Sequence, residues 1–215
     1  MHRDRVVALL LIIYVLLLPL LMAEGPFSRN EPLGQGPFAK MSMLYERTFL
    51  RVDVMTLEIY FGPDEASQIE RLAAGTQLTP ALADSIADIA LQAQNAEIHV
   101  QFKRDFSKNR FVKRARENAE RALKAGLIKQ LFYKEICDQL PIWYSFMNGR
   151  GILEGDEMFH QIKGDTLRSV YRGTDGKILM DQTQFGEQRR LALLGSYLVR
   201  NSDFRQGLIE SLFAY

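Results

Sequence analysis

The sequence predicts an α+β fold in which an antiparallel sheet packs against a layer of helices. Strand-like and helix-like segments come in clusters along the 215 residues instead of alternating one by one, which is typical of antiparallel sheets. The hydrophobic fraction of 47% and the charged fraction of 25% are those of an ordinary globular protein with one core. We therefore expect a single domain preceded by an N-terminal apolar helix and a spacer.

The N-terminus carries a hydrophobic segment that is long enough to span a bilayer. Arg3 and Arg5 precede residues 6–23, a run of 18 residues without charge, and about 20 apolar residues cross a membrane as a helix. Because basic flanks stay cytoplasmic, the rest of the chain is expected on the exported side of the membrane. Cleavage after Ala23 would place Leu21 at position −3, a poor cleavage site, which favours an uncleaved anchor over a signal peptide.

These features divide the chain into three parts. Residues 1–23 are the signal anchor or, alternatively, a signal peptide. Residues 24–40 are rich in Gly and Pro and form a spacer, and residues 41–215 form the domain. The protein is thus expected to be anchored by one span or secreted, which means periplasmic in a Gram-negative cell.

The first half of the domain begins with strand character and continues with two short helices. Residues 45–61 are rich in β-branched and aromatic side chains and end before a Gly-Pro dipeptide, which predicts one long strand or two strands joined by a bulge. Asp64 is expected to cap a helix that ends near Leu72. Thr79, followed by a Pro at the first helical position, is expected to cap the second helix.

The middle of the domain combines a strand with two helices. Residues 96–102 alternate as a strand, and Asp105 or Ser107 can cap the basic helix that follows. A helical pattern then covers residues 128–147. Pro141 is expected to interrupt it, because proline has no N–H for the helical hydrogen bond.

The last part contains a hairpin and two helices. Residues 157–162 and 166–183 read as strands, the latter a hairpin that turns at the Asp-Gly dipeptide 175–176, which tolerates positive φ. Helices are expected over residues 186–199 and 202–213.

The basic helix after residue 107 is amphipathic. Its apolar face consists of Phe111, Val112, Ala115, Asn118, Ala119, Ala122 and Leu123. Most basic side chains lie off this face, so we interpret them as the solvated back of the helix, with attraction to anionic lipid as the alternative. Nucleic-acid binding is not expected, because the formal net charge is only +1. Asn118 is the exception on the apolar face, since a buried amide needs a partner.

The order of the elements resembles the chalcone isomerase-like family. The segments that carry the resemblance are residues 47–61, 98–123, 155–179 and 191–212, whereas residues 75–95 look like an insertion or a divergent stretch. The resemblance implies an open-faced β-sandwich, with a ligand cleft between the antiparallel sheet and the helices. In catalytic members an Arg and a Thr on the first long strand, a Tyr and an Asn on the central helix and a hydroxyl on a later helix act on a chalcone. Fatty-acid-binding relatives keep the Arg for a carboxylate.

Transferred by position, the resemblance implies five ligand-binding residues. The Arg is Arg47, the Asn is Asn118 and the later hydroxyl is Ser196. Met55 stands at the position of the strand Thr, although a Thr is adjacent, and Phe111 stands at the position of the catalytic Tyr. Because Phe111 has no hydroxyl, the resemblance implies binding of a fatty acid or another small amphipathic anion, with no catalytic residue and no isomerase activity.

Two alternatives stay open at this point. One is an intramolecular lyase or isomerase on another substrate that uses Arg47, Asn118 and Ser196. The other is an interaction or scaffold protein of the cell envelope without a ligand, whose cleft would be packed shut by Met55 and Phe111. No cofactor or metal site is expected, because no phosphate loop and no pair of metal ligands at suitable spacing occurs. The sequence does not point to a particular protein partner.

Overall fold

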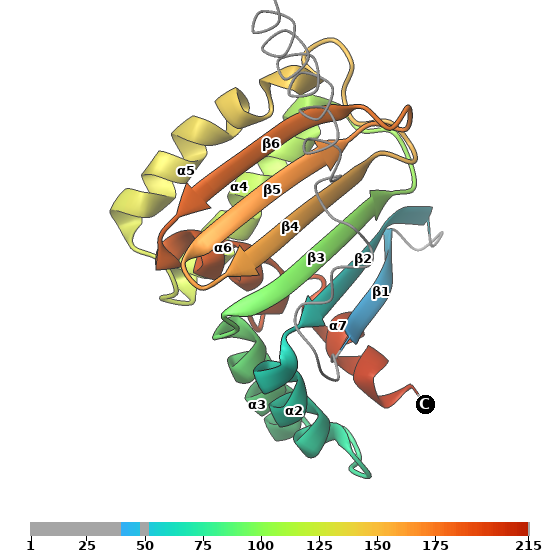
Figure 1. Cartoon of the computed structure of the whole chain (residues 1–215), viewed down its shortest axis with the longest axis vertical. Coiled ribbons are helices and arrows are strands. Elements are labelled where there is room, and N and C mark those ends of the chain that lie inside the picture. The colour runs from blue at the N-terminus through green and yellow to red at the C-terminus, as the bar shows by residue number, and fades with distance from the viewer. Residues whose placement is uncertain (1–39, 48–51, 215) are drawn as a thin grey trace, which may run out of the picture. The chain divides into compact units, whose positions relative to one another are not determined.

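A six-stranded antiparallel sheet is the centre of the fold (Figure 1). The computed structural model describes residues 40–47 and 52–214, and the predictions for residues 1–39 lie outside the described residues. The strands follow one another in the order of the sequence, β1 to β6, and helices α4, α5 and α6 lie against one face of the sheet. The predicted α+β fold with an antiparallel sheet is therefore confirmed.

The bounds of the elements agree with most of the predicted segments. The strands are β1 (Lys40–Arg47), β2 (Val52–Phe61), β3 (Asn95–Phe102), β4 (Glu157–Lys163), β5 (Thr166–Arg172) and β6 (Ile178–Phe185). The helices are α2 (Pro63–Ala73), α3 (Pro80–Leu91), α4 (Lys108–Lys124), α5 (Gln130–Trp143), α6 (Glu187–Leu198) and α7 (Arg205–Glu210), with 3₁₀ turns η1 (Ser145–Met147) and η2 (Ser211–Phe213).

The first predicted strand is in fact a pair of antiparallel strands. Arg47 ends β1 and is paired with Val52 at the start of β2, so the chain reverses direction between them. Residues 48–51 between the two strands include no Gly, Pro, Asn or Asp, so no turn was predicted there. A bulge is present, but it lies within β2: Tyr45 is paired with Met55 and the next residue of β1 with Asp53, so Val54 is the extra residue. Arg47 and Met55 consequently lie on neighbouring strands and not on one strand.

Of the N-caps predicted for the first two helices, one is wrong and one is confirmed. Helix α2 begins at Pro63 with Gly62 as its N-cap, so Asp64 lies in the first turn and is not the cap. Thr79 caps α3 as predicted, because its hydroxyl oxygen accepts a hydrogen bond of 3.2 Å from the Leu82 backbone N–H. Acidic residues in the first turn of a helix still stabilise its dipole.

Helix α5 continues through Pro141, contrary to the prediction of an interruption. The helix ends at Trp143, and the missing N–H of Pro141 leaves the carbonyl of Cys137 without its helical donor. Arg116 on α4 supplies a donor instead, since its Nη2 lies 2.9 Å from that carbonyl oxygen. A side chain of the neighbouring helix thus satisfies the backbone group that proline leaves open.

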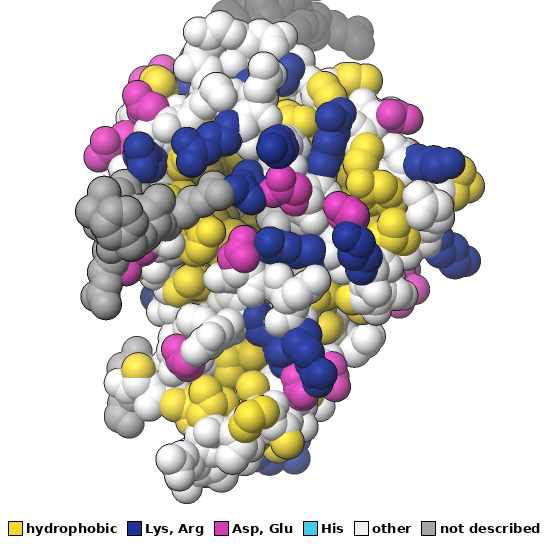
Figure 2. Space-filling model, turned by 180° about the vertical axis from the view of Figure 1, so that it is seen from behind, with side chains coloured by type: hydrophobic (Ala, Val, Ile, Leu, Met, Phe, Trp, Pro, Cys, Tyr) yellow, Lys and Arg dark blue, Asp and Glu magenta, His cyan; other side chains and the backbone are white. Residues whose placement is uncertain are grey.

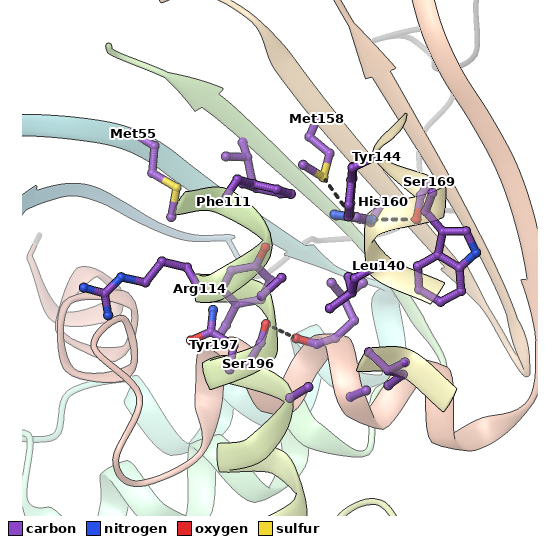
Figure 3. Close-up of a pocket in the computed structure, with 18 of the residues that line it drawn as sticks. Met55, Phe111, Arg114, Leu140, Tyr144, Met158, His160, Ser169, Ser196 and Tyr197 are labelled. Atoms are coloured by element: carbon purple, nitrogen blue, oxygen red, sulfur yellow. Dashed lines mark hydrogen bonds between the residues drawn. The ribbon is translucent and has the colours of Figure 1, made fainter. Parts of the chain in front are cut away.

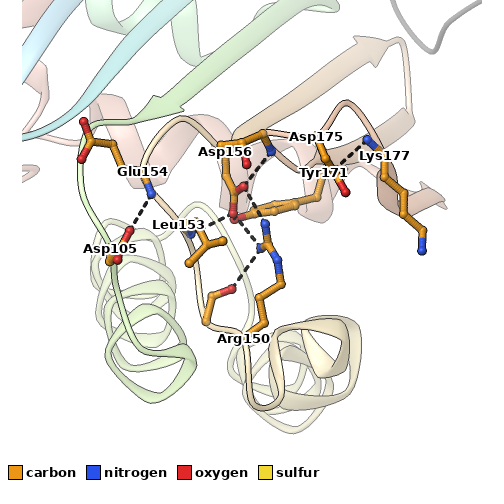
Figure 4. A network of polar contacts seen from close by, with 10 residues as sticks. Asp105, Arg150, Leu153, Glu154, Asp156, Tyr171, Asp175 and Lys177 are labelled. Carbon is orange, nitrogen blue, oxygen red and sulfur yellow. Dashed lines mark hydrogen bonds and ion pairs between the residues drawn. The ribbon is translucent and has the colours of Figure 1, made fainter.

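A buried carboxylate joins the start of β4 to β5 (Figure 4). Asp156 is fully buried and accepts hydrogen bonds of 2.7 Å from both terminal nitrogens of Arg150 and from the Tyr171 hydroxyl. The Leu153 backbone N–H donates a further bond of 2.9 Å. Burial alone would raise the pKa of Asp156, but these donors outweigh it and hold the pKa below its ordinary value. This ion pair fixes the segment that leads from α5 back into the sheet.

Several basic side chains of helix α4 form ion pairs. Arg121 contacts Asp203 at 3.1 Å, and Lys124 contacts Glu120 at 2.6 Å. Figure 2 shows the side of the molecule opposite to the view of Figure 1, where Lys and Arg side chains alternate with acidic ones instead of forming one basic field. This agrees with a solvated helix back. In the part of the chain that the structure describes, no helix is both long and apolar enough to cross a bilayer.

Candidate ligand-binding cavity

A cavity of about 250 Å³ lies between the sheet and helices α4, α5 and α6 (Figure 3). We call the face of the sheet that lines it the inner face. Most of the wall is apolar, and its largest aliphatic and aromatic contributors are Val100, Phe102, Phe111, Phe132, Ile136, Leu140, Trp143, Met158, Leu167 and Met180. Such a wall favours an occupant with a substantial apolar part.

The cavity brings together four of the five predicted site residues. Met55 reaches it from β2, Phe111 and Asn118 from α4, and Ser196 from α6. The side chain of Arg47 lies outside the described residues, and only its backbone position at the end of β1 is described. The assignment of these residues to ligand binding stays a prediction.

Phe111 belongs to an aromatic cluster in the wall. Its ring contacts Tyr144 edge to face, with centroids 4.8 Å apart, and Phe102 with centroids 6.2 Å apart. Burial raises the pKa of the Tyr144 hydroxyl to about 12, so this hydroxyl is neutral at physiological pH. The place where the resemblance puts a catalytic hydroxyl is therefore a hydrophobic contact.

The two predicted polar residues of the helices, Asn118 and Ser196, differ in whether their hydrogen-bonding groups already have partners. The Ser196 hydroxyl donates a hydrogen bond of 2.6 Å to the Leu193 carbonyl of its own helix. The Asn118 side-chain oxygen accepts from Arg121 at a long 3.5 Å, and its amide nitrogen has no partner among the residues that the structure describes. Asn118 thus has spare donors, whereas the Ser196 hydroxyl is already engaged.

Sequence reasoning missed a row of polar side chains on the inner face. His160 on β4 is paired in register with Ser169 on β5, which in turn is paired with Gln182 on β6. All three line the cavity, and His160 Nδ1 lies 2.8 Å from Ser169 Oγ. We call His160, Ser169 and Gln182 the polar row. The available signal was the alternation of β4, in which a histidine stands between Met158 and Ile162 on the buried side.

His160 is almost fully buried, with 5% of its surface exposed. Burial lowers the pKa of its imidazole to about 4, so the side chain is neutral at physiological pH. A general base works best when its pKa lies near the operating pH, which makes this imidazole a weak base. Its chemistry in the cavity is hydrogen bonding.

Arginine side chains reach the cavity from two helices. Arg114 on α4 forms an ion pair with Glu117, and in Figure 3 it points away from His160, with Phe111 between them. Arg189 on α6 lies over the Trp143 ring, with the guanidinium carbon 5.6 Å from the centroid, and forms an ion pair of 2.6 Å with Glu135. Its other terminal nitrogen donates to Gln184 at 3.3 Å. Arg189 is therefore engaged, whereas the side chain of Arg114 remains 41% exposed.

The described residues contain no cluster of three or more His, Cys, Asp or Glu side chains that could hold a metal ion. The chemistry that the cavity offers comes from its apolar wall, the Asn118 amide, the polar row and the arginines at its rim.

Comparisons with known proteins identify the fold. No family model matches the sequence, and no curated protein sequence matches it. Among solved structures, the fatty-acid binding protein from Arabidopsis thaliana is similar, with a TM-score of 0.52 over 89% of this chain and 96% of that chain. The sequence identity is 12%, so the likeness concerns the fold. The chain has a chalcone isomerase-like fold, in which an open antiparallel sheet packs against a layer of helices.

Proposed function

We propose that this domain binds a small amphipathic anion such as a fatty acid, without isomerase activity. The observation that carries the proposal is the cavity of about 250 Å³ between the sheet and the helices, whose wall is mostly aliphatic and aromatic. Burial of a hydrocarbon chain there would gain roughly 0.8 kcal/mol for each CH₂ removed from water. The likeness in fold to a fatty-acid binding protein supports the same ligand class.

The acid end of the ligand would bind near β1, β2 and α4. Arg114 and Asn118 line the cavity there, and Arg47 follows two residues after Tyr45, whose side chain is also in the wall. A guanidinium group can hold both oxygens of a carboxylate, which makes Arg47 and Arg114 the candidate partners. Asn118 would add a neutral donor.

A purely structural role is less consistent with the geometry. The scaffold alternative expects Met55 and Phe111 to pack the cleft shut, and both side chains instead line an open cavity. An enzyme of the family type would need a hydroxyl at Phe111, whose ring is occupied by the contact with Tyr144. These two observations favour a binding protein.

We also propose that the domain acts on the exported side of the membrane, with residues 6–23 as its anchor. An anchored binding domain would meet acyl chains at the membrane surface, where they accumulate. The support is the uncharged run of 18 residues after Arg3 and Arg5. Alkaline extraction of membranes and protease treatment of sealed cells test this. Recovery of the protein in the cytosol, protected from protease, would refute it.

Native mass spectrometry of the full chain tests ligand binding. We expect an adduct with hexadecanoic acid that weakens about 10-fold or more in Arg47→Ala or Arg114→Ala, because the carboxylate loses a charged partner. Lys113→Ala is the matched control, since this neighbouring side chain on α4 is exposed and not in the wall. If no long-chain acid binds to the delipidated wild type, the proposed function is wrong.

A further inference from the structure

The polar row lies on an inner face that is mostly apolar. The neighbouring inward residues are hydrophobic on β4, where they are Met158 and Ile162, and on β5, where they are Leu167 and Tyr171. On β6 Gln182 lies between Met180 and a second polar residue, Gln184, which also lines the cavity. Residues paired in register on adjacent strands hold their Cβ atoms about 5 Å apart, so His160, Ser169 and Gln182 form a continuous polar strip across β4, β5 and β6. The packing of the core does not require such a strip.

Two hydrogen-bonding groups of the polar row have no partner in the part of the protein that the structure describes. The Nδ1 atom of His160 is paired with Ser169, but its Nε2 atom has no hydrogen-bond partner in the described part of the chain. The Gln182 amide also has none among these residues, although it lines the same cavity. Both groups line the cavity, and neither is sealed in the core without a partner, so both are accessible to an occupant. An occupant that leaves them unpaired while excluding water would cost about 1–3 kcal/mol for each group, which favours one that pairs with them.

The electrostatics of the strip favour an uncharged partner. His160 is neutral, and its surroundings are too apolar to accept a carboxylate without a counter-ion. Arg189 is the nearby cation of α6, and its nitrogens are already shared between Glu135 and Gln184. A hydroxyl or carbonyl group is uncharged, so binding it there does not bury a charge without a counter-ion.

We propose that the polar row selects a ligand whose acyl chain carries a second, uncharged hydrogen-bonding group, a hydroxyl or a carbonyl, apart from its acid end. This inference rests on the proposed function and specifies the ligand class within it. The acid binds on the side of Arg114 and Asn118, the chain crosses the cavity along Phe111, and the second group reaches His160 and Gln182.

The polar row can bind either a hydroxyl or a carbonyl group, because the His160–Ser169 hydrogen bond can form with either of the two imidazole tautomers. When Ser169 donates to Nδ1, His160 Nε2 carries the proton and donates to a carbonyl or hydroxyl oxygen. When Nδ1 carries the proton and donates to Ser169, Nε2 accepts from a ligand hydroxyl. The Gln182 amide provides one further donor and one further acceptor.

A competition experiment with the full chain tests this selection. Delipidated protein is mixed with equal amounts of hexadecanoic acid and its mid-chain hydroxy and oxo derivatives, and the bound fractions are read by native mass spectrometry. We expect the wild type to prefer a hydroxy or oxo acid by about 10-fold or more, because the plain acid leaves the row unpaired.

Two substitutions at one position separate the row from the fold. His160→Asn keeps a polar atom toward Ser169 but loses the atom at Nε2, whereas His160→Gln retains a polar atom near Nε2. We expect His160→Asn and Gln182→Leu to reduce the preference to less than about 2-fold and His160→Gln to retain most of it. Thr183→Val is the control, because Thr183 follows Gln182 on β6 but is exposed on the other face.

The outcomes distinguish this inference from the proposed function. Equal binding of the plain and substituted acids by the wild type would overturn the selection by the polar row and leave fatty-acid binding intact. A preference that survives both His160→Asn and Gln182→Leu would overturn it as well. Binding of none of the acids would overturn both.

Discussion

His160 is a residue through which acid should destabilise this fold. Its pKa of about 4 in the folded protein lies below the ordinary value of 6.5, so the unfolded chain takes up a proton before the folded one does. The stabilising contribution of the neutral imidazole is therefore complete above pH 6.5 and is lost as the pH falls toward 4. We expect the free energy of unfolding to fall by roughly 2 kcal/mol from this group between pH 7 and pH 5, measured by urea denaturation.

His160→Gln is the control for this titration, because glutamine cannot take up a proton there. The difference in stability between wild type and variant should shrink between pH 7 and pH 5. A difference that stays constant over this range would mean that the imidazole is charged or solvated in the folded protein.

Some residues of the site could be predicted from the sequence, and others could not. Phe111 and Asn118 lie on an amphipathic helix, whose periodicity reveals the buried face without any tertiary information, whereas Ser196 was assigned by the family resemblance. The polar row cannot be assembled in that way, since it exists only when the registers of β4, β5 and β6 are known. Each of its members alone reads as an ordinary polar residue on a strand.

At the scale of elements, local chemistry predicted the boundaries that depend on neighbours in sequence. The Thr79 cap and the hairpin turn with Gly176 at φ 80° are both set by adjacent residues and were predicted. The reversal between β1 and β2 and the continuation of α5 through Pro141 depend on contacts with other elements and were not.

Helix α5 and helix α4 should be energetically coupled through Arg116 and Pro141. Arg116→Met should destabilise the protein by about 1 kcal/mol, because it leaves the Cys137 carbonyl without a donor. Pro141→Ala restores the backbone N–H, so the same Arg116→Met change should then cost little. A double-mutant cycle by chemical denaturation measures this coupling, and strictly additive effects of the two substitutions would contradict it.

At the scale of the whole molecule, ligand binding and stability should be linked. A ligand that binds only the folded state stabilises it by about 2.7 kcal/mol at 100 times its dissociation constant. For a domain of this size that corresponds to a rise in Tm of roughly 5 to 10 °C. We expect hexadecanoic acid, kept below its micelle concentration, to produce such a rise in thermal denaturation of the full chain.

A cavity-filling variant shows whether this stabilisation originates between the sheet and the helices. Ala115 on α4 lines the cavity one turn from Phe111, so Ala115→Leu places apolar volume where the acyl chain would lie. The acid-induced rise in Tm should then shrink to less than about half, because ligand and side chain compete for one space. Ala81→Leu, at an exposed position of α3, is the matched control and should keep the full rise. An unchanged rise in Ala115→Leu would place the acid elsewhere on the protein, since the substitution alters the cavity and leaves the outer surface as it was.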